Sequence, residues 1–137
     1  MADVKMVIVI RKDLHMRAGK MAAQACHASL KVILDRMATN HYYYGHGTRV
    51  EWVLGTDLGT PMYDWLVNGF TKVVLYVESE DAITALANRC HFMQVPHAVI
   101  TDAGRTEFHG EPTVTCIAIG PDYSEKIDDI TGDLPLL

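Results

Sequence analysis

The sequence contains only three cysteines, Cys26, Cys90 and Cys116, and they are widely spaced. An odd number of cysteines without a repeated spacing gives no disulfide framework, which excludes a small disulfide-stapled secreted fold. The apolar run Met6–Ile10 is far too short to cross a membrane, and no basic-then-apolar leader is present. We therefore expect a cytoplasmic protein with reduced thiols and no membrane partner.

Common cofactor and metal motifs are also missing. The loop glycines match neither a phosphate-binding P-loop nor a dinucleotide fingerprint, and there is no GxSxG elbow of a serine hydrolase. Cys26-His27 and Cys90-His91 resemble metal pairs, but adjacent residues on a helix point about 100° apart and do not easily share a tetrahedral zinc ion. The sequence predicts no cofactor and no metal site.

What remains is an ordinary globular composition, with 49% hydrophobic and 21% charged residues in a chain of 137. This length fits one domain, 1–137, which can bury a sufficient core without disulfides or metal. The net charge of −5 by itself argues against a nucleic-acid partner. However, residues 1–36 hold seven basic and three acidic side chains (+4), whereas residues 37–137 hold five and fourteen (−9). A basic N-terminal third thus precedes an acidic body.

Hydrophobic patterning predicts an α/β fold, a three-layer α/β/α sandwich with a mixed, roughly four-stranded sheet. The apolar, β-branched run Val4–Arg11 is typical of a central strand that is buried on both faces. We predict further strands over 72–77, 97–101 and 113–119, and helices over 20–38, 61–67, 80–92 and 123–130. The second and third strands should be parallel, and the third and fourth antiparallel.

Residues 39–62 show no sustained periodicity and are rich in glycine and tyrosine. The alternating stretch RVEWVL within them is compatible with one arm of a hairpin. The run Tyr42-Tyr43-Tyr44 has the aromatic rings to stack on bases, although a partner interface or a core location explains it equally well.

Two loops that leave predicted strands concentrate polar groups. The first leads into the first helix, where Lys20 lies near a helix N-terminus that suits a phosphate or a developing oxyanion. The second holds Asp102, Arg105 and Thr106, which combine an acid, a bidentate cation and a hydroxyl. If the two strands are parallel, both loops lie at the carboxyl edge of the sheet, where α/β proteins bind ligands. A solvated lysine and an Asx-type turn are the corresponding structural alternatives.

The first helix adds Gln24 and His27, spaced so that polar groups lie among alanines on one face. His27 has the chemistry of a general base, but a histidine packed in the core explains it more simply. Arg17 and Lys12, from the basic N-terminal third, are further candidates for substrate binding.

Several of these motifs together resemble one known family. The stretch Gly19–Ala28 resembles the GKxAAQxxHA motif of the type II peptidyl-tRNA hydrolases, and Asp102–Glu107 resembles their DAGRT(Q/E) loop. TVT followed by AIGP at 113–121, and the ending IDxxTGxLxLL, are also similar to that family. The match covers roughly 1–38 and 63–137, so residues 39–62 are predicted to be an atypical insert.

The resemblance implies hydrolysis of the ester between a peptide and the 3′ ribose of tRNA, without metal or nucleotide cofactor, by a protein that is often a homodimer. It implies Lys20, Asp102, Thr106 and Thr115 as catalytic residues, and Gln24, His27 and Arg105 as supporting or tRNA-contacting groups. Asp102, oriented by Lys20, would help to activate a water, and the threonines would position it or stabilise an oxyanion. The alternative is a non-catalytic tRNA- or protein-binding module on the same fold.

Overall fold

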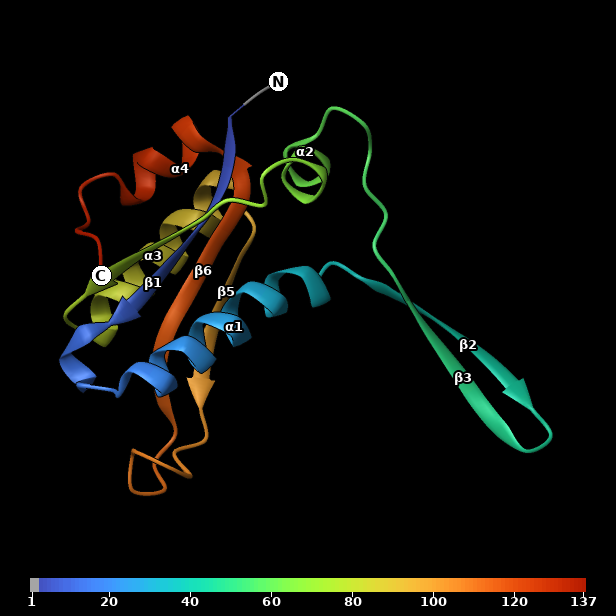
Figure 1. The fold of residues 1–137 in the computed structure, drawn as a ribbon, viewed down its shortest axis with the longest axis horizontal. Coiled ribbons are helices and arrows are strands. Elements are labelled where there is room, and N and C mark those ends of the chain that lie inside the picture. The colour runs from blue at the N-terminus through green and yellow to red at the C-terminus, as the bar shows by residue number, and fades with distance from the viewer. Residues whose placement is uncertain (1–2) are drawn as a thin grey trace.

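A mixed four-stranded sheet forms the middle layer of the protein, in the strand order β4-β1-β6-β5 (Figure 1). The computed structural model describes residues 3–137. The strands are β1 (Val4–Arg11), β4 (Lys72–Val77), β5 (His97–Asp102) and β6 (Thr113–Tyr123). β1 runs parallel to β4, and β6 runs antiparallel to both β1 and β5. The predicted mixed sheet is therefore confirmed. β4 and β5 share one direction, as expected, but β1 and β6 lie between them.

Helices cover both faces of the sheet and give the predicted three layers. On one face, α1 (Ala18–Leu34) and α2 (Pro61–Val67) pack against alternate residues of β1 and β6, and the Trp65 side chain of α2 is buried there. On the other face lie α3 (Glu80–Met93) and α4 (Ser124–Thr131), which bury Ile83 and Ile127. Met6 to Ile10 of β1 are at most 3% exposed, because neighbouring strands and both helix layers enclose them. Its uninterrupted apolar sequence reflects this central place.

Local sequence explains where two of the helices, α2 and α3, begin. The Thr60 hydroxyl accepts a hydrogen bond from Tyr63 N, and Pro61 opens α2, where its missing N–H costs nothing. The Ser79 hydroxyl accepts from Ala82 N at the start of α3, and two acids follow in the first turn. Both helices begin where the sequence predicts. Within residues 3–137, no helix combines the length and apolar character needed to span a bilayer.

Two boundaries differ from prediction by more than two residues. The first helix ends at Leu34, not at residue 38, because Ala38 already belongs to a strand. The last strand continues beyond residue 119 through a cis Gly120–Pro121 bond to Tyr123. Gly120 has φ +102°, and a Cβ there would lie 2.7 Å from the Lys5 carbonyl oxygen. The backbone of β6 at this point, where its pairing with β1 shifts register, therefore requires glycine.

A long hairpin leaves the body after α1 and projects away from the sheet (Figure 1). Its strands are β2 (Ala38–Tyr44) and β3 (Gly47–Val53), paired antiparallel as a separate two-stranded sheet. The expected hairpin arm in RVEWVL is confirmed, but its partner strand was not predicted. All residues of β2 are exposed, and so are all of β3 except the half-buried Glu51.

The C-terminal residues lie along β4, on the side away from β1. Tyr76 N donates to the Pro135 carbonyl, Leu137 N donates to the Val74 carbonyl, and Leu136 forms an antiparallel bridge with Leu75. The chain from α4 thus returns across the sheet to the outer strand.

Candidate active site

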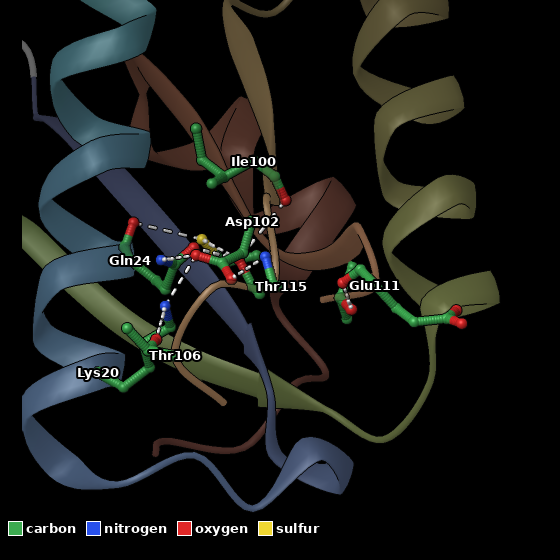
Figure 2. Close-up of polar contacts among 10 residues, drawn as sticks. Lys20, Gln24, Ile100, Asp102, Thr106, Glu111 and Thr115 are labelled. Carbon is green, nitrogen blue, oxygen red and sulfur yellow. Dashed lines mark hydrogen bonds and ion pairs between the residues drawn. The ribbon is translucent and has the colours of Figure 1, made fainter. Parts of the chain in front are cut away.

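The candidate site lies where the N-terminal part of α1 passes the carboxyl end of β5 (Figure 2). Lys20 is the third residue of α1, and Asp102 is the last residue of β5. The directions of β1 and β5 agree, so the loops that follow them meet at one edge of the sheet. The predicted convergence of these two loops is therefore what the fold produces.

Lys20 contacts both loop residues that the sequence singled out. Its Nζ lies 2.8 Å from Asp102 Oδ1 and donates to Thr106 Oγ1 over 3.0 Å. The Lys20 and Asp102 side chains are 16% and 14% exposed, so water screens the ion pair only in part. The ammonium also lies 5.8 Å from the centre of the Phe108 ring. A single cation is thereby fixed by a carboxylate, a hydroxyl and an aromatic ring.

Asp102 receives three hydrogen bonds. Oδ1 accepts from Lys20 Nζ and, over 3.2 Å, from Gln24 Nε2, while Oδ2 accepts from Gly104 N over 2.8 Å. These donors, Lys20 first, hold the pKa of the Asp102 carboxyl below its usual range against the opposing effect of burial. Asp102 is therefore ionised at neutral pH. Of its four lone-pair positions, one on Oδ2 remains for a further donor.

Gln24 and Thr115 form a buried layer beneath the ion pair. Thr115 Oγ1 donates to Gln24 Oε1 over 2.6 Å, and the exposed fractions of the two side chains are 0% and 1%. The Cys116 thiol adds a bond to the Gln24 backbone carbonyl. A continuous chain of hydrogen bonds thus runs from Thr115 on β6 through Gln24 on α1 to Asp102 on β5 (Figure 2).

A tight turn holds the loop after β5. The bond from Gly104 N to the Asp102 carboxylate is an Asx turn, so the structural alternative considered for this acid is present together with the ion pair. Gly104 has φ +83°, and a Cβ there would collide with the backbone of Glu111. Glycine is needed here for both conformation and close approach.

The four other predicted binding residues lie around this cluster without joining it. Arg105 and His27 are exposed, and neither makes a polar contact with the described residues 3–137. Arg17 is exposed and lies 3.4 Å from a Glu107 carboxylate oxygen. Lys12 is exposed with its ammonium 4.3 Å from the centre of the Tyr76 ring. The core location considered for His27 is therefore wrong, because its place on α1 faces solvent.

Two further residues near the site were not predicted from the sequence. Arg11 pairs with Asp13 at 2.7 Å and donates to the Val114 carbonyl, which ties the end of β1 to β6 next to Thr115. Phe108 packs against the core and lies below Lys20. An aromatic residue within an otherwise polar loop was the available signal for Phe108.

A hollow of about 610 Å³ lies at the opposite end of α1, lined by residues that include Val32, Asp35, His91 and His97. None of the predicted site residues lines it, so this hollow and the predicted reactive groups lie in different places. Within residues 3–137, no three His, Cys, Asp or Glu side chains are grouped so that they could hold a metal ion. The polar cluster around Lys20, not the hollow, carries the reactive groups.

This cluster has the elements that acyl chemistry requires. An ammonium and a hydroxyl at a helix N-terminus can stabilise a developing oxyanion, and an ionised carboxylate with a free lone pair can orient a water. Fold and cluster together define an α/β domain with a site of the kind that hydrolyses esters.

Comparison with known proteins identifies the family. The model of the family Peptidyl-tRNA hydrolase PTH2 matches residues 4–137. A peptidyl-tRNA hydrolase from Saccharolobus solfataricus is 37% identical over 135 residues, which cover 98% of this chain and 99% of that protein. One from Sulfurisphaera tokodaii is 40% identical over 134 residues, covering 97% and 98%. The chain belongs to the PTH2 family of peptidyl-tRNA hydrolases.

A solved structure shows the same fold at much lower sequence identity. A protein of unknown function from Agrobacterium tumefaciens strain C58 superposes with a TM-score of 0.55 at 12% identity, and the match covers 100% of this chain and 99% of that one. This likeness concerns the fold alone.

Proposed function

We propose that the protein hydrolyses the ester bond between a peptide, or an N-blocked amino acid, and the 3′ ribose of tRNA. Its membership of the PTH2 family and its relatives, which are named peptidyl-tRNA hydrolases, support this activity. The single structural observation that carries it is the contact of Lys20 Nζ with both Asp102 and Thr106 at the edge of the sheet.

Lys20 and Thr106 are the proposed oxyanion donors. Lys20 uses two of its three ammonium hydrogens on Asp102 and Thr106, which leaves one to point at a substrate oxygen. Thr106 accepts a hydrogen bond from Lys20, so its own hydroxyl hydrogen is also available. When water attacks the ester carbonyl, these two donors stabilise the negative charge that develops on oxygen.

Asp102 is proposed to orient the attacking water. Its pKa is lowered, so it is a weak base, and its free Oδ2 position can accept a hydrogen bond from water without taking the proton completely. Its negative charge also keeps Lys20 in place. As the tetrahedral intermediate collapses, the bond from the acyl carbon to the 3′ oxygen of the ribose breaks, and that oxygen takes up the proton given up by the attacking water, giving free tRNA and a peptide acid.

Thr115 and Gln24 are proposed to hold the Asp102 carboxylate in position from the buried side of the site. Thr115 was expected among the catalytic residues, but its complete burial under Gln24 favours an indirect role. By holding the Gln24 amide oxygen, Thr115 directs the Gln24 NH₂ group at Asp102. Both side chains act on the reaction only through Asp102.

The exposed cations nearby are proposed to hold the RNA. Arg105, Arg17 and Lys12 belong to the segments that follow β5 and β1 at one edge of the sheet, and the exposed His27 lies two turns beyond Lys20 on α1. Contacts of this type with phosphates should make tRNA binding weaken as salt increases. The acidic remainder of the chain repels the phosphates of tRNA, so binding should be brief enough for the product to leave after each turnover.

We also propose that the protein is a cytoplasmic homodimer. Peptidyl-tRNA, its proposed substrate, is formed on ribosomes, which supports a cytoplasmic location. Leu30 and Leu34 on α1 are 57% and 38% exposed, and such apolar side chains are suited to a contact between two copies.

A release assay tests the activity. Purified protein is mixed with an N-acetylated aminoacyl-tRNA, and free tRNA is measured over time against an uncatalysed control. We expect hydrolysis by the wild type and its loss in Lys20→Ala. If the wild type binds the substrate but releases no tRNA, the chain is a non-catalytic module on this fold.

A further inference from the structure

The hairpin formed by β2 and β3 exposes one face that is aromatic and carries no carboxylate. Directly paired residues share a face, so the pairs Thr39–Trp52, His41–Val50 and Tyr43–Thr48 lie together on one side. Trp52 is 58% and Tyr43 is 79% exposed, and the rings of His41 and Tyr43 stack with centres 6.4 Å apart. We call these six residues the aromatic face.

Nothing in residues 3–137 covers this face. None of the hairpin residues belongs to either core cluster, and both strands project away from the body (Figure 1). An isolated two-stranded hairpin is only marginally stable in water. An arm that leaves two large aromatic rings in solvent is therefore suited to contact another molecule.

The charge of this part of the chain favours a polyanion. Residues 17–53, which comprise α1 and the hairpin, contain five Lys or Arg and two Asp or Glu, a net charge of +3. The remaining residues contain seven and fifteen, a net charge of −8. The hairpin itself is neutral, because Arg49 is its one Lys or Arg and pairs with Glu51, so the positive charge of the segment lies on α1 and the residues that flank it. The hairpin is thus continuous with the basic part of an acidic protein.

The composition of the aromatic face favours RNA over a second copy of this chain. Its side chains are Tyr, Trp, His, Thr and a single Val, with no Leu, Ile, Phe or Met. Interfaces between identical subunits are more apolar than this at their centre. Exposed aromatic side chains are, in contrast, the usual platform on which unpaired bases stack.

The position of the hairpin specifies which part of the RNA it meets. α1 has 17 residues, so it spans about 25 Å between the Lys20 end and the hairpin end. Each hairpin strand of seven residues adds about 20 Å. The aromatic face therefore cannot touch the scissile ester, but a tRNA extends well beyond its 3′ end.

We infer that the hairpin is a second substrate-binding site, where the aromatic face stacks on exposed bases of the tRNA body while the 3′ end lies at Lys20. This inference rests on the proposed function. It assigns recognition of the whole tRNA to residues 38–53 and the reaction to the cluster at the sheet edge.

The test compares a long and a short substrate. A Tyr43→Ala/Trp52→Ala double variant, with Phe92→Ala on α3 as a matched control for loss of an exposed aromatic, is assayed on N-acetylaminoacyl-tRNA and on the same ester of the trinucleotide CCA. We expect KM for the tRNA to rise about tenfold in the double variant, a modest share of what two base stacks contribute. Hydrolysis of the CCA ester should stay unchanged, as should both reactions of Phe92→Ala.

An equal change on both substrates, or no change on either, would overturn the inference. Sedimentation velocity is measured in parallel, and dissociation of a dimer in the double variant would assign the face to a second copy instead. Binding of uncharged tRNA is measured by filter retention, so that the inference can be judged even if the wild type hydrolyses neither ester. Unaltered tRNA affinity in the double variant would then refute it. The variants should fold, because the replaced side chains pack on no core residue, and circular dichroism checks this.

Discussion

Thr115 donates its hydroxyl hydrogen to Gln24 Oε1 over 2.6 Å, in a place that no solvent reaches. This bond determines which way the Gln24 amide faces, because the oxygen must receive the hydroxyl and the NH₂ group is then directed at Asp102. The orientation of a charged group at the surface thus depends on a hydroxyl buried in the sheet.

The Thr115→Val substitution should therefore slow the reaction without weakening substrate binding. Valine has nearly the same shape but leaves Gln24 Oε1 buried without a donor, which costs about 1–3 kcal/mol of stability. We expect a lower kcat with KM little changed, measured by tRNA release. Thr115→Ser, which restores the hydroxyl, should recover most of the rate. A Val variant with normal kcat would show that the Gln24 amide needs no such support.

Lys20→Ala should reduce kcat about 100-fold or more, because an oxyanion donor and the partner of Asp102 are lost together. Lys31→Ala is the matched control. Lys31 is a lysine of the same helix that also pairs with an aspartate, Asp35, but lies about three helical turns beyond Lys20. We expect the control to keep near-normal turnover. Similar rates for the two variants would place the chemistry elsewhere.

Asp102→Asn should change how stability depends on pH. The folded-state pKa of Asp102 is lowered, so its stabilising contribution is complete above the unfolded value of about 3.9 and is lost as pH falls through the folded value. The wild type should therefore lose stability more steeply than Asp102→Asn on acidification below about pH 5. Urea unfolding between pH 3 and 7 measures the difference. Parallel curves would mean that the carboxylate gains nothing from Lys20 and Gly104.

Two glycines of the loop after β5 allow a controlled test of its geometry. Gly104 and Gly110 have φ of +83° and +80°, but a Cβ would strike the Glu111 backbone only at Gly104 and would meet open space at Gly110. Gly110→Ala should cost about 1 kcal/mol through backbone strain alone. Gly104→Ala should cost clearly more and also lower kcat, because Asp102 loses its turn. Thermal unfolding and the release assay measure both effects.

The three thiols should differ sharply in reactivity. Cys26 is exposed, whereas burial raises the pKa of Cys90 to about 12 and that of Cys116 to about 11. Iodoacetamide at pH 8 should therefore modify one cysteine in the folded protein and three after denaturation, as counted by mass spectrometry. Cys26→Ser should remove the native reaction. Modification of a second thiol in the folded state would indicate local opening of the core.

Much of this architecture was accessible from sequence. Continuous apolar runs identified β1 and β4, and Pro61 and Ser79 marked helix starts, because these signals are local. The end of α1 was missed because Met37 and Ala38 suit a helix as well as a strand. β2 was missed because it has no buried side, so its residues show no alternation of apolar and polar types.

For the site, sequence motifs and loop placement brought Lys20, Asp102 and Thr106 into consideration, and the fold places them in contact. The burial of Thr115 and the exposure of His27 were not predictable, because both depend on how α1 is rotated against β5 and β6. The contact of Phe108 with Lys20 depends on the path of a loop, for which no periodicity exists.

The C-terminal residues 135–137 cover the outer edge of β4. By bonding to Val74 and Tyr76, they occupy hydrogen-bonding groups of β4 that would otherwise be open to a strand from another chain. The sheet is consequently protected from edge-to-edge aggregation on that side. Truncating the last three residues would remove this protection. A purification tag is therefore better placed at the N-terminus.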